Sequence, residues 1–222
     1  MVSGSRNVFW QALVFTIIVF GLGLLLGYYF EISRASSLEL NLLSSEMSLF
    51  DEQLRSKIVG ESNLSCEVAV GSTFAFADKI YDEALRLEKY DSSSKFNRDV
   101  LLVLHRRYDL LRTMLWDESI SLKKRCPGFH TVVYFFNYSP EDVELKGRQV
   151  FLSRLLTDVK NEHPSDVLLI PIASNLDLIS VEIAMESYGV KNSPAILIDE
   201  KKVVDYIVTL KEMEDFIFSQ SK

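Results

Sequence analysis

The chain has 222 residues, of which 48% are hydrophobic, and a formal net charge of −7 at pH 7. All 31 acidic residues follow residue 30, whereas one of the 24 basic residues, Arg6, precedes it, so the part after residue 30 has 23 basic residues and a net charge of −8. This negative balance argues against nucleic acid or anionic lipid as the main partner.

An uncharged apolar run covers residues 8–30. As a helix rising 1.5 Å per residue it spans about 34 Å, enough to cross a bilayer core of about 30 Å. Trp10 and Tyr28-Tyr29 lie where interfacial anchors are expected. Arg6 precedes the run and Glu31 follows it, which favours a cytoplasmic N-terminus and a C-terminal region outside the cytoplasm. We therefore predict a single-pass protein of the cell membrane.

A cleaved signal peptide is the alternative interpretation, because Ser33-Arg34-Ala35 resembles a cleavage site. The apolar run is longer than the roughly 7–15 residues usual in such peptides, which favours an uncleaved anchor. Gly23 and Gly27 form a G-x-x-x-G pattern, which can bring two membrane helices together. A homodimer through these glycines is therefore a hypothesis.

Residues 31–127 are predicted to be helical. The first part, 31–60, carries one apolar stripe and reads as a stalk that could extend the membrane helix; the stripe comprises Leu43, Met47, Phe50, Leu54 and Ile58. Gly60-Glu61-Ser62-Asn63 breaks it, and Asp91-Ser92-Ser93-Ser94 is a later turn. Apolar spacing over residues 65–90 and 95–124 predicts two long antiparallel helices, with the stalk as a candidate third member.

The chain has two cysteines, Cys66 and Cys126. An antiparallel hairpin of nearly equal arms brings them together, which predicts a structural disulfide, consistent with a location outside the cytoplasm. A redox pair or a metal site is the alternative. Neither cysteine has a second cysteine two residues away, and His105, His130 and His163 lack the spacing of metal ligands. We therefore predict no metal site and no cofactor.

From residue 128 onward, strands and helices alternate. Pro194 suits the first residue of a strand because it cannot donate to a sheet, and Gly189 suits a helix C-terminus. The predicted order is β-α-β-α-β-β-α, with strands at 131–136, 167–172, 195–198 and 203–208 and helices at 143–161, 178–188 and 211–219.

This order, with Ser193-Pro194 before the third strand, resembles the thioredoxin-like fold, in which a cis proline lies beside the active site. The resemblance covers about residues 130–220. It implies an α/β thioredoxin-like domain, here preceded by a long helical hairpin and an N-terminal transmembrane helix. Redox-active members carry Cys-x-x-Cys after the first central strand, where residues 137–144 contain no cysteine. The resemblance therefore implies a redox-inactive member without catalytic residues, and a candidate peptide-binding groove at Tyr138, Ser193 and Pro194.

The predicted organisation has five parts: a tail (1–7), a transmembrane helix (8–30), a stalk (31–60), a disulfide-clamped hairpin (61–127) and a thioredoxin-like domain (128–222). His105-Arg106-Arg107, in the third helix, is interpreted as a solvated face. No glycine-rich phosphate loop, G-x-S-x-G or H-E-x-x-H motif occurs.

We expect a membrane-anchored extracytoplasmic protein that is not an enzyme. It would contact membrane lipid through residues 8–30, bind a protein partner and act as an interaction or scaffold module. One alternative is a thiol-disulfide oxidoreductase or redox relay that uses Cys66 and Cys126. The other is a structural subunit of a membrane or cell-surface assembly.

Overall fold

The computed structural model describes residues 3–61, 64–91 and 98–219. Residues 62–63, at the predicted helix break, and 92–94, in the predicted turn, lie outside the described residues, as do the side chains of the predicted tail and of Leu43. The chain divides into two compact units, Met1–Asp51 and Glu52–Lys222, which are described separately below.

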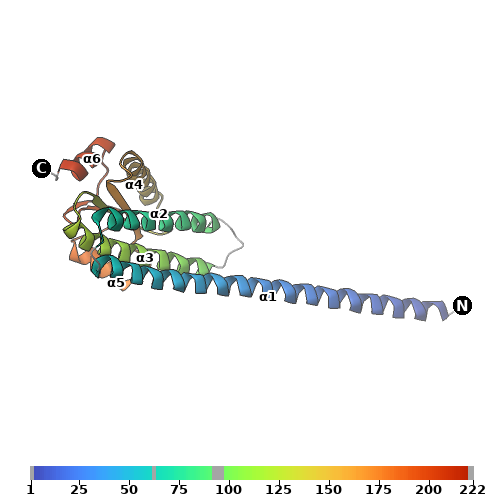
Figure 1. The fold of residues 1–222 in the computed structure, drawn as a ribbon. Helices are drawn as coiled ribbons and strands as arrows, with labels where there is room; N and C mark the ends of the chain where they lie inside the picture. Colours follow the sequence, from blue (N-terminus) through green and yellow to red (C-terminus); the bar gives the residue numbers. More distant parts are fainter. Residues whose placement is uncertain (1–2, 62–63, 92–97, 220–222) are drawn as a thin grey trace. The chain divides into compact units, whose positions relative to one another are not determined.

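The first unit consists of the N-terminal part of helix α1 (Ser3–Glu61) (Figure 1). Its segment Val8–Phe30 is long and apolar enough to cross a membrane, and none of its residues is buried. The predicted apolar N-terminal helix is therefore present, with the exposed apolar side chains that a lipid-facing helix requires. Gly23 and Gly27 are both exposed.

The second unit contains a four-stranded mixed sheet in the order β2-β1-β3-β4. β1 pairs in parallel with β2 and antiparallel with β3, which pairs antiparallel with β4. The predicted mixed α/β class is confirmed. The elements in chain order are β1 (His130–Phe136), α4 (Val143–Glu162), β2 (Val167–Ala173), α5 (Ile179–Ser187), β3 (Ala195–Ile198), β4 (Lys202–Val204) and α6 (Leu210–Phe218).

The last strand is shorter than the sequence indicates. A strand over residues 203–208 is wrong beyond Val204, where β4 ends. Arg148 of α4 donates to the carbonyl oxygen of Asp205 at 2.9 Å. Val208 then leaves the sheet edge and is buried in the core beneath α4 and α6. Asp205 and Val208 therefore make their contacts outside the sheet, whereas Tyr206 and Ile207 are exposed.

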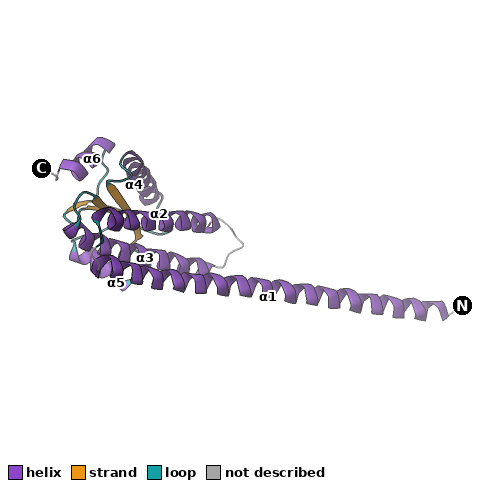
Figure 2. Ribbon diagram, viewed as in Figure 1, coloured by secondary structure: helices purple, strands orange, loops and turns teal. Residues whose placement is uncertain are grey.

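One face of the sheet packs against α4 and α6 (Figure 2). Because successive strand residues point to opposite faces, Val132 and Tyr134 of β1 enter this core together with Ile196 and Ile198 of β3. The helices contribute Leu152, Leu155, Leu156, Val159, Met213 and Ile217. Tyr134 is buried.

The opposite face is covered by helices α2 (Cys66–Asp91) and α3 (Arg98–Arg125) together with α5 (Figure 2). Trp116 of α3 is only 2% exposed. Its ring lies 5.8 Å from that of Phe135 in β1 and 5.2 Å from that of Tyr188, which follows α5. The helical hairpin thus covers this face of the sheet together with α5, and the hairpin and the sheet belong to one compact unit.

The end of α1 joins this unit through polar residues. Arg55 donates to Glu52 at 2.7 Å and to Glu118 of α3, also at 2.7 Å, and Thr73 of α2 donates to the second oxygen of Glu118. Val59 is buried nearby and its carbonyl accepts from Arg125. Two residues of the predicted apolar stripe, Leu54 and Ile58, do not take part in this contact, since they are 58% and 50% exposed.

A disulfide joins Cys66, the first residue of α2, to Cys126, which follows α3. The predicted pairing is therefore confirmed. Cys126 is buried, whereas Cys66 is exposed. The bond closes the hairpin at the end where Pro127 and Gly128 lead into β1.

An ionic cluster ties the hairpin to the turn between β3 and β4. Lys123 of α3 donates to Asp199 at 2.7 Å and to Glu200 at 2.9 Å, and Trp116 Nε1 donates to Glu200 at 3.0 Å. Burial by itself would raise the pKa of Asp199, but hydrogen bonds from His130 and Lys123 outweigh it and hold the pKa at about 2. Asp199 is therefore charged at neutral pH and keeps α3 on the sheet.

Candidate functional site

A cluster of uncharged polar side chains lies where β1 ends. We call Asn137, Gln149, Ser174 and Ser193 the Asn137 cluster. Gln149 of α4 accepts from the main-chain N–H of Asn137 at 2.9 Å and donates to its carbonyl at 3.0 Å. Ser193 donates to the side-chain oxygen of Asn137, and Ser174 donates to Ser193 at 2.8 Å. The cluster therefore connects four segments that are distant in the sequence.

Tyr138 is held beside this cluster by Asn175, the neighbour of Ser174, and by α3. Its main-chain N–H donates to Asn175 Oδ1 at 2.6 Å, and its carbonyl accepts from Asn175 Nδ2 at 3.1 Å. The ring of His105, on α3, lies 4.3 Å from the ring of Tyr138. Tyr138 is half-buried, so part of its surface stays open to solvent.

Helix α3 also supports the loop that follows β2. Arg106 donates to the carbonyl of Leu176 at 2.7 Å and forms an ion pair with Asp177 at 3.1 Å. Asp109 accepts from the main-chain N–H of Ala173 at 3.2 Å and pairs with Arg112 at 3.0 Å. Burial raises the pKa of Asp109 to about 6, so its charge changes within a physiological range.

The Ser193–Pro194 peptide bond is cis, as the resemblance implies. Pro194 is buried and Ser193 is half-buried. Among the described residues, the main-chain N–H and C=O of Ser193 form no hydrogen bond. Extended peptides bind to proteins through main-chain donors and acceptors of this kind.

The structure places part of the predicted groove close together. The cluster brings Ser193 and the segment of Tyr138 together through Asn137 and Ser174. The interpretation of His105-Arg106-Arg107 as a solvated face is wrong, because all three residues are half-buried and the first two contact residues 138, 176 and 177. Asn137, Gln149, Ser174 and Asp109 were not identified from the sequence, since isolated polar residues carry no spacing signal.

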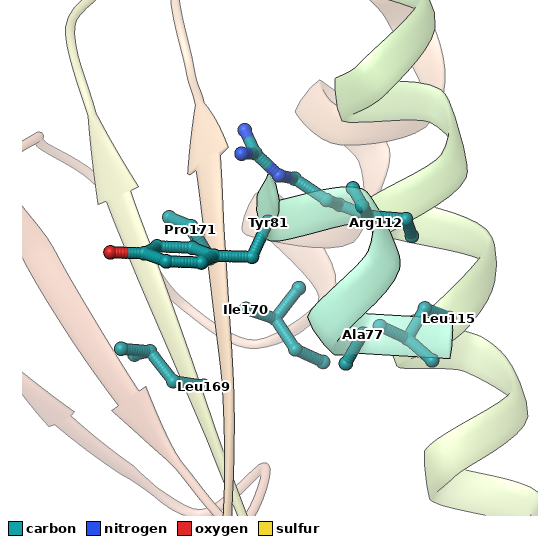
Figure 3. Close-up of a pocket in the computed structure, with 8 residues that line it drawn as sticks. Ala77, Tyr81, Arg112, Leu115, Leu169, Ile170 and Pro171 are labelled. Carbon is teal, nitrogen blue, oxygen red and sulfur yellow. The ribbon is translucent and has the colours of Figure 1, made fainter. Parts of the chain in front are cut away.

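A separate recess lies between α2, α3 and β2 (Figure 3). Ala77 and Tyr81 of α2 face Ile170 and Pro171 of β2 across it, and Arg112 lies at its rim. Its volume is about 10 Å³, which is about the size of one water molecule. The recess is therefore a packing gap rather than a ligand site.

The Asn137 cluster consists of two hydroxyl and two amide side chains, all joined by hydrogen bonds. Both cysteines of the chain lie in the Cys66–Cys126 disulfide. The arrangement can bind and orient a polar or peptide group.

Comparison with known proteins gives little beyond the geometry. No family model matches the chain, and no curated protein matches it. Among solved structures, the oxidised form of thioredoxin O2 from Arabidopsis thaliana is similar over 50% of this chain and 90% of its own, with 15% identity and a TM-score of 0.34. A likeness at that level carries no argument about function.

Proposed function

We propose that this protein is a membrane-anchored, extracytoplasmic interaction module of thioredoxin-like type, without catalytic residues, that binds an extended protein segment beside Tyr138, Ser193 and Pro194. Residues 8–30 hold it in the membrane, and the compact unit that begins at Glu52 carries the binding surface.

The observation that carries this proposal is the main chain of Ser193. Its N–H and C=O form no hydrogen bond among the described residues, while its side chain is held by Asn137 and Ser174. A main-chain donor and acceptor held in a fixed position can form hydrogen bonds with the main chain of an extended peptide. The half-buried ring of Tyr138 adds an apolar surface that can contact a side chain of that peptide.

Site-specific photo-crosslinking in native membranes tests this proposal. A photoreactive phenylalanine analogue at position 138 should give a discrete protein adduct, whereas the same analogue at Phe151, an exposed position on α4, should not. Adding Asn137→Ala should lower the yield at position 138 several-fold, because the cluster that holds Ser193 is lost. Equal adducts at both positions, or a yield that Asn137→Ala leaves unchanged in a folded chain, would contradict the proposal.

A redox relay through Cys66 and Cys126 is a second candidate, favoured by the exposure of Cys66. Cys66 is also the first residue of α2, and redox-active cysteines commonly lie at helix N-termini. This candidate predicts an easily reduced bridge and measurable insulin reduction. The interaction module predicts no insulin reduction by the intact chain.

A structural subunit of a larger assembly is a third candidate. The exposed Leu54 and Ile58 favour it, because an apolar strip on a helix can pack against a neighbouring protein. This candidate predicts stable co-purification with defined neighbouring proteins. The double change Leu54→Gln and Ile58→Gln should abolish the co-purification, whereas Asn137→Ala should not.

A further inference from the structure

A group of metal-ligating side chains lies where the end of α4 meets α6, apart from the Asn137 cluster. Glu162 is the last residue of α4, His163 is the C-cap residue that follows it, and Glu214 lies on α6. One imidazole nitrogen and two carboxylate oxygens from these residues all lie within 4.8 Å of one another. Figure 1 shows the two helices side by side.

The local sequence explains the position of His163. Pro164 disfavours helical geometry at the residue before it, and His163 has φ −127° and ψ 59° while its N–H still donates to Val159. Its ring packs against Phe218, the last residue of α6, with the ring centres 4.5 Å apart. Nε2 of His163 consequently lies 3.4 Å from Oε1 of Glu214.

The two carboxylates meet in an unfavourable electrostatic setting. The C-terminal end of a helix carries partial negative charge, which disfavours a carboxylate such as that of Glu162. Within the described part of the chain, no lysine or arginine forms an ion pair with Glu162 or Glu214. Lys160, three residues before His163, donates instead to the carbonyls of Pro164 and Val167. A cation between the carboxylates would offset their repulsion.

We propose that Glu162, His163 and Glu214 bind a divalent transition-metal ion. Among such ions, zinc matches this set of ligands best. Zinc accepts imidazole nitrogen and carboxylate oxygen, and sites with three protein ligands keep a water molecule in the fourth position. In a tetrahedron with bonds of about 2.0–2.1 Å, ligand atoms lie about 3.3–3.4 Å apart. The 3.4 Å between His163 Nε2 and Glu214 Oε1 matches that spacing, and a carboxylate oxygen of Glu162 lies within 4.8 Å of both atoms.

The ion would fasten α6 to the end of α4. Residues 162 and 163 belong to one end of a helix, whereas residue 214 comes from the last helix of the chain. The unfolded chain does not hold these three ligands together, so the ion binds the native state preferentially and stabilises it. The stability of the fold should therefore depend on the metal concentration, whereas binding at the interaction surface should not.

Isothermal titration of zinc into the full chain, in detergent, without a polyhistidine tag and after removal of metals with EDTA, tests the assignment. The unaltered protein should bind one ion per chain. His163→Ala and Glu214→Gln should each weaken binding at least tenfold and remove most of the zinc-dependent increase in Tm. His105→Ala and Glu186→Gln are matched controls that should keep the original affinity, since Glu186 is an exposed glutamate in the last turn of α5.

Far-UV circular dichroism establishes that each variant is folded. If His163→Ala unfolds, His163→Gln provides the same comparison, because glutamine retains a polar side chain but lacks the imidazole. The assignment is overturned if the folded, unaltered protein shows no saturable zinc binding. It is also overturned if His163→Ala and Glu214→Gln bind zinc as tightly as the two controls.

Discussion

Asp109 is a buried acid whose side chain links α3 to the end of β2. It is 1% exposed, pairs with Arg112 and accepts from the main-chain N–H of Ala173. Burial disfavours the carboxylate more than these partners favour it, which is why its pKa rises from 3.8 to about 6. In the folded protein this side chain therefore binds a proton more readily than it does in the unfolded chain.

That difference predicts a specific pH dependence of stability. Between about pH 4 and pH 6 the native state holds more protons at Asp109 than the unfolded state does, so the free energy of unfolding should fall as pH rises through this window. The change is about 2–3 kcal/mol at 1.36 kcal/mol per pKa unit. Urea unfolding of the protein and of Asp109→Asn from pH 4 to pH 7 measures it.

Asp109→Asn should flatten the unfolding free energy across that window. Asp199 supplies an internal contrast. Its pKa is lowered to about 2, so its stabilising effect is complete above about pH 4 and is lost only in more acidic solution. Parallel pH profiles for the unaltered protein and Asp109→Asn would contradict the assignment of the effect to Asp109.

At the scale of elements, the hairpin of α2 and α3 acts as a layer of the α/β fold. Trp116 packs against Phe135 and Tyr188, and Lys123 binds the turn between β3 and β4. The sheet face that α4 and α6 leave uncovered is apolar and would otherwise lie in water. Removing the hairpin would therefore expose buried apolar side chains of this face, including Phe135.

The disulfide should contribute substantially to the stability of this layer. Cys66 and Cys126 are 60 residues apart, and in the chain-entropy model a bridge across such a loop stabilises the native state by about 4 kcal/mol. The double change Cys66→Ser and Cys126→Ser should lower the free energy of unfolding by up to about that amount. Denaturant unfolding of the oxidised protein and the double variant provides the comparison.

The reduction potential of the same bridge separates two of the functional candidates. A structural bridge should stay oxidised in protein taken from membranes and resist reduction to below about −300 mV. Thiol alkylation and mass spectrometry in defined dithiothreitol buffers report this. A bridge that opens near about −200 mV would favour the redox relay over the interaction module.

At the scale of the whole molecule, the exposed apolar segment Val8–Phe30 and the compact unit Glu52–Lys222 occur in one chain. The first has the length and composition to cross a bilayer, and the second has its own core. We predict that the protein stays in the membrane pellet after alkaline extraction, whereas a chain lacking residues 1–30 is released.

Orientation can be tested in the same membranes with a thiol reagent that does not cross them. With the disulfide intact, Lys191→Cys should be labelled from outside the cell because Lys191 is exposed and lies in the predicted extracytoplasmic part. Ser3→Cys should be labelled only after the membrane is opened. The reverse pattern would show that the compact unit lies in the cytoplasm.

The sequence alone was sufficient for features that depend on local pattern. The apolar run Val8–Phe30, the strand β1 and the pairing of Cys66 with Cys126 follow from composition, β-branched density and hairpin symmetry, and each is found in the structure. Such features are determined by residues close together in the chain or by the ends of long helices, so they can be recognised in the sequence.

Only the tertiary structure decided which side chains meet across distant segments. Asn137 contacts Ser193, Lys123 contacts Asp199, and His163 contacts Glu214. Each contact results from the packing of elements whose relative positions are not encoded by any periodicity in the sequence. Polar contacts of this kind need only one residue from each element, so they leave no repeat in the sequence. The shortened β4 also depends on distant segments, because Arg148 of α4 binds the carbonyl of Asp205 and Val208 packs in the core under α4 and α6.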